Sequence, residues 1–169
     1  MNYKPLAGGC TRRKEAFELI IENLSIDLET KSSININECG VYKYAESPDF
    51  DVLLFGVSVN QGPIAVYDIA CGEEIPDEIL VALSNDQVIK TAYNASFERI
   101  CLSAWLRKKH PRHFRPYDPE GKYLSPISWQ CTMVWGAYDG LPLGLEKVGT
   151  VLSLSEQKLR EGKDLIGYF

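Results

Sequence analysis

Two carboxylates two residues apart on one apolar strand are the sharpest chemical feature of this sequence. In the segment 24–30, LSIDLET, apolar and acidic residues alternate, so Asp27 and Glu29 are predicted to project from the same face of a strand. Like charges this close repel unless solvent or a cation compensates them, and carboxylate oxygens are the ligands that Mg²⁺ and Ca²⁺ prefer. The pair therefore indicates either a divalent-metal site or a solvated strand end.

A third acid, Glu98, follows a second predicted strand at 88–93. It lies in the segment Asn94-Ala95-Ser96-Phe97-Glu98, where Asn94 is positioned to cap a helix that extends to about residue 107. The end of a strand and the start of the next helix can converge on one cleft of a mixed sheet. The alternative is an ordinary acid in the first turn of a helix, where the helix dipole favours it.

A basic loop follows this helix and is rich in proline. Its cationic residues either form a solvated surface or contact phosphate beside the acidic site. They are Arg107, Lys108, Lys109, Arg112 and Arg115.

The hydrophobic pattern predicts an α/β fold with one mixed sheet and helices on its faces. A strand is expected at 24–30 and a hairpin at 51–69, and most of the predicted helices follow them in the chain. The other predicted elements are helices at 12–23, 76–84, 129–138, 143–152 and 156–166.

Composition limits the class of protein. The chain has 169 residues, a mass of 19.0 kDa, a net charge of −5 and five cysteines without C-x-x-C spacing. One domain of ordinary size is expected, and the acidic balance argues against a protein that coats nucleic acid through bulk charge. Neither a secretory signal nor a membrane span is recognisable, so we expect a cytoplasmic protein with reduced thiols, no zinc site and no membrane partner.

Taken together, these segments resemble a known family. Asp27-Leu28-Glu29-Thr30 is similar to the first motif of the DEDD 3′–5′ exonucleases, and the segment 94–98 is similar to the second. The segments between and after these motifs resemble the N-terminal proofreading domain of bacteriophage-type family A DNA polymerases. Examples are CGVYKY at 39–44, SWQCTM at 128–133 and EGKDLI at 161–166. The resemblance covers residues 24–169 and leaves 1–23 as an N-terminal extension, expected to be helical.

The resemblance implies an RNase H-like fold and a metal-dependent reaction. In that family two Mg²⁺ or Mn²⁺ ions, about 3.5–4 Å apart, clamp the scissile phosphate of a DNA 3′ end. By analogy Asp27 bridges both ions, Glu29 holds the ion on the nucleophile side, and Glu98 contributes to the other. The residues expected against the terminal nucleotide of single-stranded DNA are Thr30, Asn94 and Phe97.

One family motif is missing from the sequence. The third motif is Tyr or His followed four residues later by Asp, and no such spacing occurs before Phe169. The chain is therefore expected to be the front part of a longer protein or a remnant of one, with weak or no turnover by itself. If the chain alone degrades DNA, the fourth ligand must come from an unexpected residue such as Asp164 or from a partner chain. The competing hypothesis is a non-catalytic RNase H-like module that braces a polymerase domain or binds nucleic acid or protein.

Overall fold

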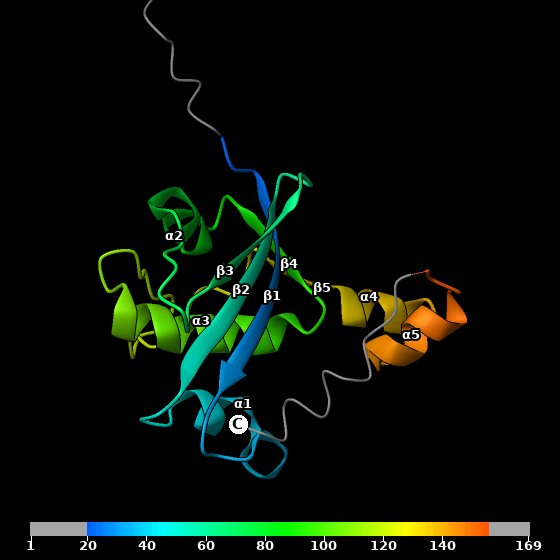
Figure 1. The fold of residues 1–169 in the computed structure, drawn as a ribbon, viewed down its shortest axis with the longest axis horizontal. Coiled ribbons are helices and arrows are strands. Elements are labelled where there is room, and N and C mark those ends of the chain that lie inside the picture. Colours follow the sequence, from blue (N-terminus) through cyan, green and yellow to red (C-terminus); the bar gives the residue numbers. More distant parts are fainter. Residues whose placement is uncertain (1–19, 156–169) are drawn as a thin grey trace, which may run out of the picture.

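A computed structural model describes residues 20–155 of the chain as one mixed sheet with helices (Figure 1). The predicted helix at 156–166 and most of the one at 12–23 lie outside this range. The elements are β1 (Asn23–Lys31), α1 (Ile36–Ala45), β2 (Asp51–Val59), β3 (Ile64–Asp68), α2 (Asp77–Leu83), β4 (Ile89–Ala92), α3 (Ala95–Lys109), β5 (Trp129–Cys131), α4 (Thr132–Tyr138) and α5 (Leu145–Val151).

The five strands are ordered β3-β2-β1-β4-β5. β1 pairs antiparallel with β2 and parallel with β4, while β2–β3 is antiparallel and β4–β5 is parallel. The predicted α/β class with a mixed sheet is thus confirmed. β1 is central, and its paired acids lie in the middle of the sheet.

The predicted hairpin at 51–69 is present as β2 and β3. Its turn contains Asn60 and Gln61, both in the left-handed region with φ of 51° and 59°. Asn60 also fixes the start of β1, because its Oδ1 accepts the backbone N–H groups of Glu22 at 2.8 Å and Asn23 at 3.1 Å. The hairpin turn therefore anchors the chain where it enters the sheet.

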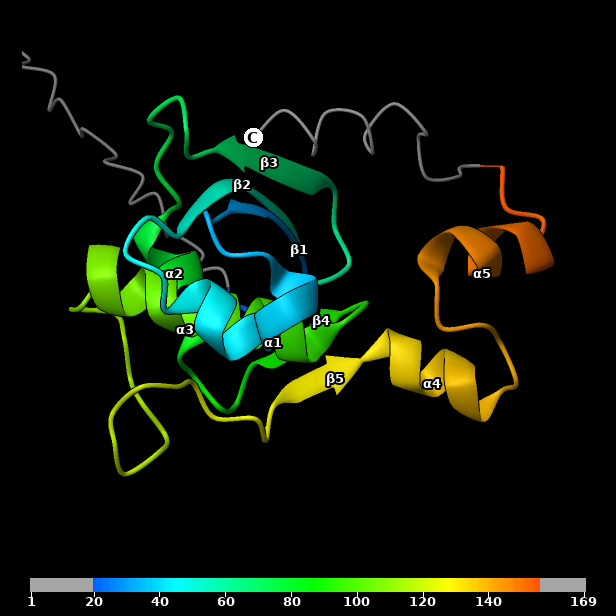
Figure 2. The same cartoon turned by 90° about the horizontal axis from the view of Figure 1, so that it is seen from below.

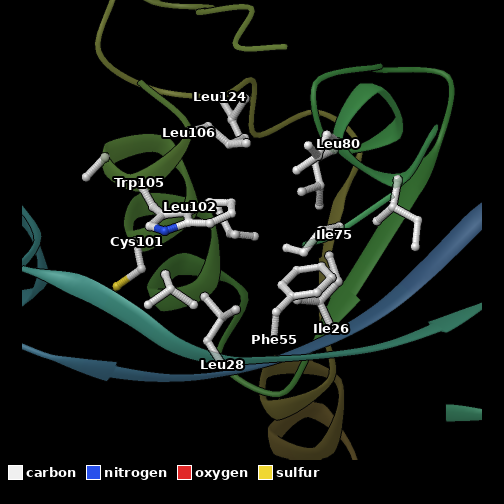
Figure 3. Close-up of a cluster of buried hydrophobic side chains, with 14 of the residues drawn as sticks. Ile26, Leu28, Phe55, Ile75, Leu80, Cys101, Leu102, Trp105, Leu106 and Leu124 are labelled. Atoms are coloured by element: carbon white, nitrogen blue, oxygen red, sulfur yellow. The ribbon is translucent and has the colours of Figure 1, made fainter. Parts of the chain in front are cut away.

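The hydrophobic core lies between one face of the sheet and α3. Leu24, Ile26 and Leu28 of β1 point toward this side and are all buried. Figure 3 shows Leu28 and Phe55 from the sheet facing Leu102 and other side chains of α3. Since apolar residues alternate with Asp27 and Glu29 along β1, burying one set directs the acids to the opposite face.

The helices are distributed unevenly about the sheet. Figure 2 shows α1, α2 and α3 on the core side, whereas α4 and α5 extend away beyond β5. The opposite face, which carries Asp27, Glu29 and the exposed Ile64 and Val66 of β3, is not covered by any of these helices.

Three expectations about the elements need correction. The segment 129–138 was predicted to be one helix, but its first three residues form β5, because Lys90 to Ala92 of β4 offer them a parallel pairing edge. α1 was not predicted; Asn35 caps it by accepting the N–H of Asn37. The helix predicted to reach residue 23 does not do so, since Asn23 is the first residue of β1 and residues 20–22 are not helical.

Between Ile20 and Ser155, no helix combines the length and the apolar character needed to cross a bilayer.

Candidate active site

The two acids of β1 lie side by side on the exposed face of the sheet. Both Asp27 and Glu29 are exposed, and Gly56 lies opposite Asp27 on the neighbouring strand. A Cβ atom at Gly56 would stand 3.5 Å from the carbonyl oxygen of Asp27 and 3.8 Å from its Cβ. The absence of a side chain at position 56 leaves this flank of Asp27 open.

The other flank of Asp27 is open because β4 is short. Pairing of β1 with β4 runs from Asn23–Ile89 to Ser25–Thr91. Beyond Ala92 the chain leaves the sheet and turns into α3. A crevice outside the carboxyl end of a strand is where open α/β sheets bind their ligands. Asp27 lies at this position, beside the turn.

Glu98 reaches the same place from the first turn of α3. Its side chain is 5% exposed, and its Oε2 atom has no hydrogen-bond partner among the described residues. Burial raises the pKa of Glu98 from 4.5 to about 7, a backbone hydrogen bond opposes this rise, and the Asp27 carboxylate adds to it. Asp27 and Glu98 thus lie near enough for their carboxyl groups to interact electrostatically, and the role in metal binding expected for them stays a prediction.

Aromatic side chains lie next to these acids on the core side of the sheet. The Tyr44 ring of α1 lies 6.3 Å from the Phe97 ring of α3, and the Tyr44 hydroxyl lies 2.9 Å from Thr30 Oγ1. Burial raises the pKa of Tyr44, and the Glu29 carboxylate adds to this, so the phenol is protonated at neutral pH. Thr30 and Phe97 were expected to contact a nucleotide, and the structure places them around one tyrosine.

Sequence reasoning gave Tyr44 no role. It lies in the segment 39–44 that carries part of the family resemblance, but α1 was not predicted, so nothing indicated that Tyr44 faces Thr30. Cys101 was also missed. It is fully buried one turn after Glu98, and burial together with the Glu98 carboxylate raises the pKa of its thiol, which keeps it neutral.

Asn94 occupies the N-cap position of α3, as predicted, but makes no capping hydrogen bond with its side chain. Its carbonyl oxygen instead accepts the N–H of Phe97 at 2.7 Å. The Asn94 side chain is exposed, and its capping role is unfilled. A role in substrate contact remains a prediction.

The basic residues at the end of α3 make structural contacts. Arg107 pairs with Glu46 at 3.1 Å and Lys109 pairs with Asp51 at 3.1 Å. Lys108 Nζ donates to the carbonyl oxygens of residues 48 and 50 at 3.2 and 3.3 Å. These three cations tie α3 to the loop between α1 and β2.

The rest of the basic loop continues from that end of the helix. Glu98 and Lys109 are eleven residues apart on α3, which corresponds to about 16 Å along the helix axis. The guanidinium of Arg115 donates to the carbonyl oxygens of Arg112 at 2.8 Å and Phe114 at 3.0 Å. The basic end of α3 is thus not adjacent to Glu98, and contact with phosphate remains a prediction for the basic residues.

The donor set suits a hard divalent cation, although the described residues do not form a finished metal site. Within residues 20–155, no three His, Cys, Asp or Glu side chains converge closely enough to bind a metal. The carboxylate oxygens of Asp27 and Glu98, including the Oε2 atom of Glu98 that has no hydrogen-bond partner, nevertheless fit Mg²⁺ or Mn²⁺. A cation there would supply the positive charge that the buried Glu98 lacks.

The comparison with known sequences agrees with this geometry. The DNA polymerase of Bacillus phage SP02 is 44% identical over 149 residues, which cover 88% of this chain. This chain is similar to one part of that polymerase and spans 21% of its length. No protein-family profile matches this chain.

The comparison of structures agrees with the fold. The structure of Brucella melitensis NrnC bound to pGG aligns with a TM-score of 0.51 and 16% sequence identity, covering 83% of this chain and 56% of NrnC. The predicted RNase H-like fold is thereby confirmed. At this identity the likeness speaks for the fold alone.

Proposed function

We propose that residues 24–169 form a metal-dependent 3′–5′ exonuclease domain of a phage-type DNA polymerase. It removes nucleotides from single-stranded DNA 3′ ends in the cytoplasm of a bacterial or phage-infected cell, and a polymerase domain follows in the longer parent protein. The observation that carries the proposal is the pairing of Asp27 with a buried Glu98 whose Oε2 atom lacks a partner. Buried carboxyl groups with a raised pKa are concentrated at functional sites.

The candidate site residues have two proposed roles, metal binding and nucleotide binding. Asp27, Glu29 and Glu98 would hold Mg²⁺ or Mn²⁺, which when bound activate a water and stabilise the leaving 3′ oxygen. Glu98 would bind a cation as the carboxylate, a form within reach at neutral pH because its pKa is about 7. Thr30, Asn94 and Phe97 receive the terminal nucleotide and orient its phosphate toward the acids.

A second function has an observation in its favour. The described residues gather fewer than three metal ligands in one place, which fits a non-catalytic RNase H-like module that binds a DNA end or a polymerase domain. Both functions use the same crevice, so the difference between them is turnover.

Digestion of a single-stranded oligonucleotide distinguishes the two. A 5′-labelled DNA strand is incubated with the 169-residue chain and Mn²⁺, and products are resolved by length. Glu120→Gln is the matched control for Asp27→Ala and Glu98→Gln, because Glu120 is an exposed acid paired with Lys122. The exonuclease proposal expects a weak ladder, in keeping with the missing third motif, that shortens from the 3′ end with wild type and Glu120→Gln and disappears in the other two variants.

Retention of the ladder by Asp27→Ala would contradict the proposed active site. Binding of the strand without any ladder, lost in Asp27→Ala and Glu98→Gln, would instead support the non-catalytic module. A chain that neither cuts nor binds the oligonucleotide would exclude both the exonuclease and a module that binds a DNA end.

A further inference from the structure

Tyr44 and Thr30 form a hydroxyl pair at the border of the crevice. Their oxygen atoms are 2.9 Å apart, and either hydroxyl can be the donor. Two hydroxyl groups carry two protons, and the bond between them uses one. Whichever residue donates, one proton remains to be given to an acceptor on a bound molecule. Both side chains are half-buried, so one side of the pair faces outward.

The backbone around Thr30 is shaped to hold this pair. The register between β1 and β2 shifts after Glu29, which pairs with Leu54, whereas Thr30 pairs with Val52. Leu53 is the extra residue of a bulge, a device that redirects side chains at the edges of sheets. Ser32 Oγ further donates to the carbonyl oxygen of Tyr44 at 3.1 Å. Two separate hydrogen bonds therefore fasten the last turn of α1 to the end of β1.

The ring of Tyr44 is held as firmly as its hydroxyl. Phe50 packs against it edge-on at 5.6 Å, and Phe97 lies at 6.3 Å with a tilt of 38°. Phe97 precedes Glu98, and Thr30 follows Glu29, so each partner of Tyr44 adjoins one of the acids. Tyr44 thus contacts both the end of β1, which carries Glu29, and the first turn of α3, which carries Glu98.

We propose that Tyr44 is a positioning residue for the terminal nucleotide, acting by fixing the Thr30 hydroxyl so that the pair donates its remaining proton to an oxygen of that nucleotide. This inference rests on the proposed function. The inference extends that function by assigning a role in nucleotide binding to a residue of α1, an element outside both exonuclease motifs.

The test measures binding of a short 5′-fluorescein-labelled oligothymidylate to the 169-residue chain by fluorescence anisotropy in Mg²⁺. Tyr44→Phe removes only the hydroxyl and Thr30→Val removes its partner, whereas Thr30→Ser keeps the hydroxyl. Tyr42→Phe is the matched control, because Tyr42 lies on the same helix, is 49% exposed and contacts Tyr123 instead. Thermal melting of each variant reports stability separately.

Loss of one hydrogen bond predicts affinity reduced about 3- to 10-fold in Tyr44→Phe and in Thr30→Val. The double variant should lose no more than either single variant, because both act through one pair. Thr30→Ser, which keeps the hydroxyl, should bind more tightly than Thr30→Val, and Tyr42→Phe should bind like wild type. A role confined to folding would lower the melting temperature of Tyr44→Phe and leave its affinity for the oligonucleotide unchanged, and that outcome overturns the inference.

Multiplicative losses in the double variant would also overturn it, since they would show that the two hydroxyls act independently. These results are distinguishable from a failure of the proposed function. If Asp27→Ala cleaves and binds as wild type does, the proposed site itself is wrong and the inference falls with it. If Asp27→Ala is impaired but Tyr44→Phe is not, only the role of Tyr44 is wrong.

Discussion

Replacing Glu98 with glutamine should remove a specific pH dependence of stability. Glu98 is buried, and two titratable groups face it, the Asp27 carboxyl of β1 and the Cys101 thiol of α3. Burial raises its pKa from 4.5 to about 7, so the folded protein keeps a proton there that the unfolded chain releases. Between these two pH values the folded state binds more protons, and stability must fall as the pH rises.

The size of the effect follows from the two pKa values. The interval from 4.5 to about 7 corresponds to about 3 kcal/mol, since each pKa unit is about 1.4 kcal/mol. Wild type should lose about this much more unfolding free energy than Glu98→Gln on going from about pH 4 to about pH 8.5. Titration of all other groups is shared by both proteins, so it cancels in the difference.

Urea unfolding followed by tryptophan fluorescence measures this difference across the pH range. A second series with Mg²⁺ at pH 8 should stabilise wild type and have little effect on Glu98→Gln, because the ionised carboxylate is the form that binds a cation. The control is Glu120→Gln, at an exposed acid. If wild type and Glu98→Gln show parallel dependence on pH, Glu98 is not protonated in the folded protein and the reasoning is refuted.

Three further outcomes are expected. Lys90 is 1% exposed and burial lowers its pKa to about 8, so the melting temperature of wild type should rise between about pH 8 and 10 and that of Lys90→Met should not; an equal rise in both would contradict this. Leu102→Ala in the core should cost about 2–5 kcal/mol of unfolding free energy in urea titrations, whereas Val81→Ala at a half-exposed site should cost less than about 1 kcal/mol; similar losses would place Leu102 outside the packed core. A maleimide should label the exposed Cys71 in the folded protein and spare Cys101, as peptide mapping would reveal, and prompt labelling of Cys101 would show that α3 opens readily.

The sequence predicted the strands and helices with strong local patterns. The apolar strand and turn of the hairpin at 51–69 and the helical spacing of α3 depend on neighbours in the chain, which a sequence displays directly. β5 was missed because three residues become a strand only when β4 offers a pairing edge. α1 was missed because Gly40, with φ of 74°, interrupts its regular pattern.

For the candidate site too, the sequence indicated residues with local patterns but not contacts that depend on packing. Asp27, Glu29 and Glu98 were singled out because alternation along a strand and a helix start are local features, and their role as metal ligands stays a prediction. The contact of Tyr44 with Thr30 depends on how α1 packs against the sheet, and no spacing between residues 30 and 44 encodes it. The distance of the basic end of α3 from Glu98 likewise depends on the length of that helix.

The strand order also determines when the acidic site can form during folding. β2 and β3 are neighbours in sequence and can pair within microseconds, as hairpins do. β1 must pair with β4, which brings Asn23 beside Ile89 across a long intervening segment, and such distant contacts close slowly. Since Glu98 follows β4, the carboxylates cannot meet until that late step. A ribosome must therefore release the chain well past α3 before the nascent protein can hold a cation in this crevice.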